Sequence, residues 1–210
     1  MDNILIYEKI YNKIKTANNI LLATHEKPDV DAASSVCAII EFLEILGKKY
    51  SAYCFDPIPL QFGFLPHAEK IKSDKTAFNF SSFDLIITLD CGSINRTKLT
   101  EEIKKRNSDQ FLIEIDHHVK VENGAAMELR SPAFSSTTEA VYEFFKANKI
   151  KINKNMANCI LAGILTDSGN FIYQATSDKT IKISSEMLSR GANLTQITES
   201  TLRNKNIVAL

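Results

Sequence analysis

The chain has 210 residues, and its 25 basic residues balance its 25 acidic residues, so nothing predicts a partner held by bulk charge, such as duplex nucleic acid. Apolar residues make up 44% of the chain, which is enough to fill the core of one large domain or two small ones. No apolar run approaches the ~20 residues that span a bilayer, and the first residues lack the basic-then-apolar pattern of a signal peptide, so we expect a cytoplasmic protein without a membrane segment.

Helix-like and strand-like patterns alternate along the first half of the chain. Apolar residues at helical spacing predict helices over 3–17, 32–46 and 97–106, the second of them ending at Gly47. Short apolar runs predict strands over 20–24, 48–54, 85–89 and 111–115, and an irregular segment over 56–82. This alternation predicts an α/β fold with a mostly parallel, Rossmann-like sheet flanked by helices.

The second half of the chain reads as helical. Ser136-Thr137-Thr138-Glu139 has capping-box spacing before a helix over 140–145. Two further helices are predicted over 155–165 and 177–189, the last one closed by Gly191. No linker divides residues 1–200, so we expect them to form one domain with a helical C-terminal part.

Groups of Asp and His follow the apolar segments. They are His25-Glu26-Lys27-Pro28-Asp29-Val30-Asp31, Asp90-Cys91-Gly92, Asp116-His117-His118 and Thr166-Asp167-Ser168-Gly169. In open parallel sheets, ligands bind where the strands end, and carboxylates and imidazoles are common ligands of catalytic divalent metals. Together the four groups predict one two-metal site and hydrolysis at phosphorus.

The spacing within these groups suggests how the ligands divide between two metals. Asp29 and Asp31 alternate along an extended segment that also carries His25, so each can face a different cation. Asp90, at a neighbouring strand end, is placed to bridge both cations, and His117 and Asp167 can complete the second site. Asp116 is expected to orient a histidine rather than to bind metal.

Simpler interpretations exist for each residue. An Asp after a strand is usually a helix cap or a turn residue, Cys91 suits packing, and a His pair commonly lies on the surface. These interpretations weaken because three of the four histidines fall within the groups. The fourth, His67, lies in a loop rich in Pro and Gly, and we expect it on the surface.

These motifs resemble the DHH phosphoesterase superfamily, named for the sequence found here as Asp116-His117-His118. The resemblance covers roughly residues 20–200. Within the superfamily, Pro28, Ser135-Ser136-Thr137 and Thr166-Asp167-Ser168-Gly169-Asn170-Phe171 most resemble the RecJ-like oligoribonucleases that also act as phosphoadenosine-phosphate phosphatases.

The resemblance implies a catalytic role for each residue. His25, Asp29 and Asp90 would hold one metal, and Asp31, Asp90, His117 and Asp167 would hold the second; the metal that the resemblance implies is manganese. His118, with Asp116 behind it, would face the phosphate. The implied substrate is a small nucleotide or a short single-stranded oligonucleotide, and a homodimer is a further expectation. Such proteins carry a second, substrate-gripping domain, so residues 201–210 are expected to begin a linker toward it.

Three alternatives remain at this stage. Inorganic pyrophosphate is a less favoured substrate because no cluster of Lys and Arg accompanies the motifs. A non-catalytic, metal-binding or regulatory module would be supported by a damaged ligand set, and none is damaged. A Rossmann nucleotide binder needs a glycine-rich turn after the first strand, where the chain has Thr24-His25-Glu26-Lys27.

Overall fold

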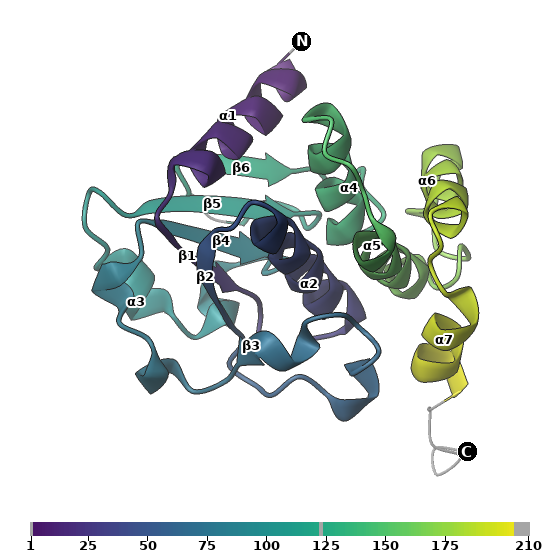
Figure 1. Cartoon of the computed structure of the whole chain (residues 1–210), viewed down its shortest axis with the longest axis horizontal. Helices are drawn as coiled ribbons and strands as arrows, with labels where there is room; N and C mark the ends of the chain where they lie inside the picture. Colours follow the sequence, from purple (N-terminus) through teal and green to yellow (C-terminus); the bar gives the residue numbers. More distant parts are fainter. Residues whose placement is uncertain (1, 122–123, 204–210) are drawn as a thin grey trace.

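The computed structural model describes residues 2–121 and 124–203, and a parallel sheet forms the centre of this part of the chain (Figure 1). The sheet has six strands in the order β3-β2-β1-β4-β5-β6, and every neighbouring pair is parallel. The strands are β1 Asn19–Ala23, β2 Lys49–Tyr53, β3 Ile71–Lys72, β4 Leu85–Leu89, β5 Phe111–Asp116 and β6 Met127–Arg130. The predicted α/β class and parallel sheet are confirmed.

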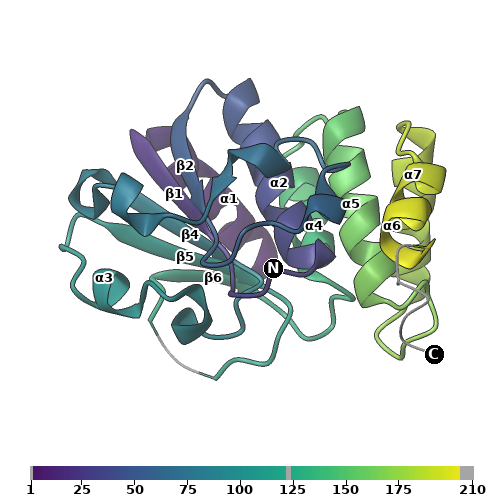
Figure 2. The ribbon, with the colours of Figure 1, turned by 90° about the horizontal axis from the view of Figure 1, so that it is seen from below.

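Helices cover the sheet unequally. They are α1 Asp2–Thr16, α2 Val30–Ile45, α3 Thr100–Lys104, α4 Thr137–Ala147, α5 Lys154–Asp167, α6 Asp178–Ser189 and α7 Leu194–Thr198, followed by a π-helical turn at Glu199–Arg203. Helices α2 and α4 lie on one face and α5 packs against both, while α6 and α7 form an outer layer beyond α5 (Figures 1 and 2). None of the described helices is long and apolar enough to cross a membrane.

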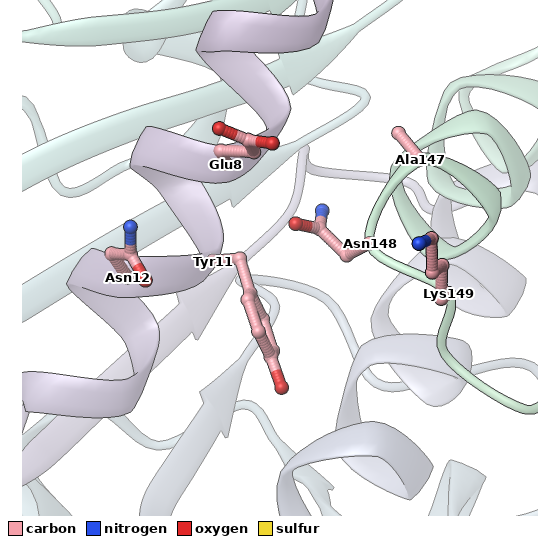
Figure 3. Close-up of a pocket in the computed structure, with 6 residues that line it drawn as sticks. All are labelled: Glu8, Tyr11, Asn12, Ala147, Asn148 and Lys149. Carbon is pink, nitrogen blue, oxygen red and sulfur yellow. The ribbon is translucent and has the colours of Figure 1, made fainter.

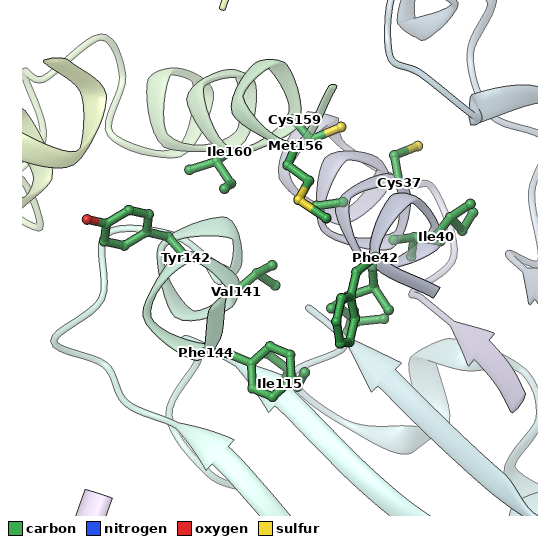
Figure 4. Close-up of a cluster of buried hydrophobic side chains, with 14 of the residues drawn as sticks. Cys37, Ile40, Phe42, Ile115, Val141, Tyr142, Phe144, Met156, Cys159 and Ile160 are labelled. Atoms are coloured by element: carbon green, nitrogen blue, oxygen red, sulfur yellow. The ribbon is translucent and has the colours of Figure 1, made fainter. Parts of the chain in front are cut away.

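Apolar residues on alternating sides of the strands build two cores. Leu22 and Ile87 belong to the larger cluster beneath the helical layer, whereas their neighbours Leu21 and Ile86 belong to a smaller cluster on the opposite face. Burial of every residue of β1 and β4 explains why these strands are continuous apolar runs. Figure 4 shows how α2, α4 and α5 converge above β5 through side chains such as Phe144.

The order of the strands creates a switch point between β1 and β4. From β1 the chain runs outward to β2 and β3, then returns to β4 on the other side of β1 and continues to β5 and β6. The loops that leave β1 and β4 therefore diverge, and ligands of open α/β sheets bind in the crevice that such a divergence leaves.

Several local predictions were wrong or incomplete. The helix predicted over 97–106 is a 3-10 turn, Ile94–Thr97, followed by the short α3, because Lys98 between them has a left-handed φ of 59° that no α-helix accepts. Three further elements, β3, β6 and α7, were not predicted because they have two to five residues each and are too short for a periodic pattern. The predicted linker, 201–210, falls partly in the π-helical turn, and residues 204–210 lie outside the described residues.

The capping box predicted at Ser136 is only half present. The Ser136 hydroxyl accepts a hydrogen bond from the Glu139 amide at 3.1 Å, as expected for the cap of α4. The Glu139 carboxylate, however, accepts from the amide and hydroxyl of Ser135 instead of from the Ser136 amide. It also accepts from the Thr180 hydroxyl of α6, so this buried carboxylate joins α4 to the outer helical layer.

Candidate metal centre

The structure brings all four polar groups to the carboxyl end of the sheet. His25 follows β1, Asp90 follows β4, and His117 follows β5. Asp31 lies in the first turn of α2, and Asp167 ends α5. Their ligand atoms form three overlapping groups, each with all atoms within 4.8 Å of one another: His25 with Asp29 and Asp90, Asp31 with His117 and Asp167, and Asp90 with His117 and His118.

The first group is built around the buried His25 imidazole. Its Nδ1 lies 2.6 Å from the Glu26 carbonyl oxygen, which can only accept, so Nδ1 carries the proton. In a neutral ring this leaves the lone pair on Nε2, and Nε2 has no hydrogen-bond partner within the described part of the chain. It lies 3.7 Å from Asp29 Oδ2 and 3.8 Å from Asp90 Oδ2. A buried imidazole nitrogen without a hydrogen-bond partner, together with the two carboxylates beside it, is a suitable set of ligands for a divalent cation.

The second group uses the other oxygen of the Asp90 carboxylate. Asp90 Oδ1 lies 3.5 Å from His117 Nε2, and the same Nε2 lies 3.1 Å from Asp167 Oδ2. The two oxygens of Asp90 therefore face two different ligand groups, which is the geometry expected of a bridging carboxylate. Asp90 adopts a left-handed φ of 61°, a conformation that non-glycine residues rarely hold outside constrained sites.

Asp31 is held by the N-terminus of α4. Its Oδ2 accepts from the Thr137 amide at 2.6 Å, and its Oδ1 accepts from the amide and hydroxyl of Thr138 at 3.1 and 2.8 Å. The Thr137 hydroxyl donates to Asp90 Oδ1 at 2.7 Å. Helix N-termini favour negative charge, so α4 stabilises a carboxylate that belongs to α2.

Gly163 of α5 makes room for this arrangement. A Cβ at this position would lie 2.3 Å from Asp31 Oδ1 and 2.3 Å from Thr138 Oγ1. The sequence analysis did not single out Gly163, Thr137 or Thr138 as site residues. A glycine inside an otherwise apolar helix was the available signal for a close approach.

Burial and mutual repulsion set the charge state of the carboxylates. Burial, and then the nearby Asp31 and Asp29, raise the pKa of Asp90 well above its usual value. The same causes raise the pKa of Asp167 to about 8, and burial together with Asp29 raises the pKa of Asp31 to about 7. Burial and the neighbouring His118 lower the pKa of His117, which favours the neutral, ligating form. Carboxylates that repel one another beside the neutral His117 imidazole fit two divalent cations, whose four positive charges would balance four carboxylates.

Asp29 has two functions in the structure. Its Oδ1 caps α2 by accepting from the Ala32 amide at 2.9 Å, as the simpler interpretation expected, while Oδ2 faces His25. Burial works against ionisation of Asp29, but the nearby His25 ring and the hydrogen bond from the Ala32 amide outweigh it, and its pKa is lower than usual. The cap fixes the carboxylate in place and leaves one oxygen directed at the site.

Asp116 contacts His118 and does not fall in any of the three ligand groups. Its Oδ1 lies 2.8 Å from His118 Nδ1 and accepts from the His118 amide at 2.9 Å. Burial opposes its ionisation, but these bonds and the Arg130 guanidinium lower its pKa to about 2. The lowered pKa favours the ionised form of Asp116, and its contact with Nδ1 fixes the orientation of the His118 ring.

The prediction for His67 was wrong. The side chain is 13% exposed, and its Nε2 lies 2.5 Å from Glu41 Oε2 of α2. The loop folds back over α2 because Glu41 offers a carboxylate there, which also accepts from Asn153 and Asn155. His67 belongs to this structural network and to none of the three ligand groups.

The hollow shown in Figure 3 lies apart from this chemistry. It has a volume of about 300 Å³ and lies between α1 and the end of α4. Its lining includes one carboxylate, Glu8, and one ammonium, Lys149, with the amides of Asn12 and Asn148. Because none of these residues belongs to the four polar groups, the hollow is not part of the candidate metal centre.

Comparison with known sequences identifies relatives of the chain. The DHH family, N-terminal domain, matches residues 19–164. The chain is 29% identical over 182 residues to the probable bifunctional oligoribonuclease and PAP phosphatase NrnA of Streptococcus mutans, and the match covers 87% of this chain and 56% of that protein. The chain spans about half the length of the curated relatives it matches.

Solved structures share the fold. An exopolyphosphatase-related protein from Bacteroides fragilis superposes with a TM-score of 0.86 at 24% identity, covering 95% of this chain and 60% of that one. The exonuclease RecJ bound to manganese superposes with a TM-score of 0.56 at 13% identity, covering 96% of this chain and 55% of that one. A related fold therefore binds manganese, and the present chain has clusters of Asp and His that can hold metal.

Proposed function

The chain belongs to the DHH family, and from that membership we propose that it hydrolyses phosphoester bonds in short oligonucleotides or small nucleotide phosphoesters, with two divalent cations bound. The position of Asp90 carries the proposal. Its two oxygens face His25 on one side and His117 on the other, at 3.8 and 3.5 Å. A carboxylate shared between two ligand groups is what a pair of neighbouring cations requires.

The proposed ligands divide into two sets that share Asp90. His25, Asp29 and Asp90 hold one cation, and Asp31, Asp90, His117 and Asp167 hold the other. Cations at such sites activate water and offset negative charge on phosphate oxygens. Manganese is the proposed metal because it accepts mixed imidazole and carboxylate ligands and because RecJ was solved with manganese.

His118 is the proposed contact to the substrate phosphate. Its Nδ1 is directed at Asp116, which leaves Nε2 as the free ring nitrogen on a side chain that is 41% exposed. In its protonated form this nitrogen donates a hydrogen bond to a phosphate oxygen. Asp116 fixes the ring before substrate arrives, so less ordering is needed in the transition state.

Exposed apolar side chains that follow site residues in the chain favour nucleotides over pyrophosphate. Val119 directly follows His118 and is 68% exposed, while Ile172 and Tyr173 follow Asp167 in the chain and are 83% and 60% exposed. Nucleobases stack on aromatic side chains, whereas pyrophosphate has no apolar part that could contact these exposed side chains. The NrnA relative of Streptococcus mutans is named as an oligoribonuclease and PAP phosphatase, which agrees with this preference.

The test is a substrate panel combined with metal analysis. Di- to pentanucleotides, a nucleoside 3′,5′-bisphosphate, cyclic dinucleotides and pyrophosphate are assayed with Mn²⁺, with Mg²⁺ and after chelation. We expect two metals per chain and hydrolysis of the nucleotide substrates. A metal stoichiometry of zero, or a fully loaded protein that cleaves nothing in the panel, would contradict the proposal and favour a non-catalytic module. Cleavage of pyrophosphate alone would support the pyrophosphatase alternative.

The homodimer stays a prediction, which sedimentation analysis can test.

A further inference from the structure

A buried arginine lies behind the two histidines. Arg130 of β6 is paired in register with Asp116 of β5, and its side chain is only 7% exposed. Nη2 lies 2.7 Å from Glu114 Oε2, and Nη1 lies 3.1 Å from Asp116 Oδ2. Nη1 also donates to the His118 carbonyl oxygen at 3.3 Å. The guanidinium therefore touches both the backbone of the His117–His118 turn and the carboxylate that orients His118.

Asp116 joins two loops of the candidate metal centre. Its Oδ2 accepts from the Gly92 amide at 2.7 Å, two residues after Asp90, and its Oδ1 accepts from the His118 amide and faces His118 Nδ1. With Arg130 on Oδ2 as well, both oxygens have two partners each. The distance between the β4 exit loop and the β5 exit loop is thus set by one carboxylate held against one guanidinium.

We propose that Arg130 is a positioning residue that fixes the His117–His118 turn relative to Asp90, acting through Asp116 and the His118 carbonyl. This inference rests on the proposed function. Arg130 touches neither the proposed metals nor the substrate. Its planar fork binds two carboxylates and a carbonyl at once, which a lysine ammonium cannot reproduce with the same geometry. The phosphate contact made by His118 therefore depends on a residue of the neighbouring strand.

Glu114 makes a clean experiment possible. Both carboxylates beside Arg130 are buried, Glu114 at 4% and Asp116 at 1% exposure, so Arg130→Met alone leaves two buried charges without their cation. Such a loss typically costs about 3–5 kcal/mol and can prevent folding. The double variant Glu114→Gln/Arg130→Met removes one charge of each sign and keeps the net charge of this cluster.

The experiment compares four variants in steady-state kinetics. For Glu114→Gln/Arg130→Met we expect kcat to fall about 10–100-fold, the usual cost of changing an outer partner of a site residue, with manganese stoichiometry and KM close to those of the wild type. Arg130→Lys should recover part of the lost kcat. Glu114→Gln should keep the wild-type kcat because Glu114 does not contact His118. Arg106→Met is the control for a lost arginine, since the hydrogen bonds of the Arg106 side chain within the described residues go to the backbone carbonyls of Ile103 and Gly124.

A second readout does not depend on activity. The Nδ1–H proton of His118 should give a slowly exchanging imidazole NMR signal in the wild type and in Glu114→Gln, and this signal should broaden in the double variant as the turn loses its anchor. If the wild type cleaves no phosphoester, the proposed function fails, while the NMR signal still tests Arg130. A double variant with wild-type kcat and an unchanged signal would overturn the inference. So would an equal loss of kcat in Glu114→Gln.

Discussion

Strand β4 has an aspartate at each end, and the two carboxylates have opposite surroundings. Asp84, just before the strand, accepts from the amides of Asn18 and Asn19 at 2.7 and 3.0 Å and from the Asn18 side chain at 3.0 Å. Asp90, just after it, accepts one hydrogen bond within the described residues, from Thr137. The remaining neighbours of Asp90 include three other carboxylates.

The pKa values follow from this difference. Burial works against ionisation of Asp84, but the hydrogen bonds from Asn19 and Asn18 outweigh it and hold its pKa below the usual value. At Asp90 burial and the charges of Asp31 and Asp29 act in the same direction and raise the pKa. Hydrogen bonds therefore stabilise the charge of Asp84 at the amino end of the strand. At the carboxyl end, the charges of Asp90 and the neighbouring carboxylates would be balanced only by bound cations. The same residue type serves stability at one end and, by our proposal, metal binding at the other.

The largest expected effect on activity and stability comes from replacing the aspartate at each end of β4 by asparagine, which removes the charge. Asp90→Asn should reduce activity well beyond the about 10–100-fold cost of changing an outer partner, because it removes the proposed shared ligand. The metal-free variant should melt at or above the wild-type temperature, since a repelling buried charge is gone. Asp84→Asn should have the reverse profile, with normal activity and a lower melting temperature. Similar activity losses in both variants, measured by kinetics and calorimetry, would erase the contrast between the two ends.

Cation binding should stabilise only through the carboxyl end. Manganese at about 100 times its dissociation constant adds about 2.7 kcal/mol to the free energy of unfolding, which raises the melting temperature by about 5–10 °C for a chain of this size. Asp84→Asn should show the same rise, and Asp90→Asn should show little of it. Thermal melts with manganese and with a chelator check this expectation. A full rise in Asp90→Asn would place the bound cations elsewhere.

Gly163 tests how tightly the carboxyl end is packed. Gly163→Ala places a Cβ 2.3 Å from Asp31 Oδ1, and we expect a loss of about 1–3 kcal/mol from overpacking together with weaker manganese binding. Gly47→Ala is the matched control. Gly47 has a left-handed φ of 64° and open space around its Cβ position, so that change should cost about 1 kcal/mol and leave manganese affinity unchanged. Titration calorimetry and denaturant unfolding separate the two outcomes.

The smallest effect is the pH dependence at the amino end. Because the folded-state pKa of Asp84 is depressed, its contribution is present above the unfolded-state pKa of about 3.9 and disappears as pH falls through the folded-state value. Asp84→Asn should therefore cost about 1–2 kcal/mol at pH 7, and the difference from the wild type should shrink below about pH 4. Denaturant unfolding at both pH values provides the measurement. A constant difference would show that Asp84 acts by shape and not by charge.

The sequence was sufficient to predict the parts of the molecule that depend on local pattern. Doubly buried strands such as β1 and β4 appear as apolar runs, and the strand-end rule then places His25 and Asp90 together. The predicted Asp and His residues do lie together at this edge, although their roles as metal ligands stay predictions. The spacing already suggested that Asp90 bridges two cations, and the resemblance to a family added which cation each of Asp29 and Asp31 would hold.

The remaining features depend on contacts between distant segments. Thr137 and Thr138 reach Asp31 across more than 100 residues, and no periodicity within α4 indicates that its N-terminus faces a carboxylate. Arg130 lies in a four-residue strand that was not predicted. The position of His67 was not predicted because the composition of a loop does not reveal the half-buried acceptor, Glu41, onto which the loop folds.

The hydrogen bonds from the N-terminus of α4 to Asp31 offer a way to detect metal binding by hydrogen-deuterium exchange. The amides of Thr137 and Thr138 donate to the Asp31 carboxylate oxygens that a cation would also approach. The helix amides and a bound ion would therefore compete for the lone pairs of these oxygens. Loading of the centre should therefore alter the hydrogen-deuterium exchange of these two amides, far more than that of amides in the middle of α4. The exchange rates of these two amides in the first turn of α4 should therefore report metal binding at the centre, even when no substrate is present.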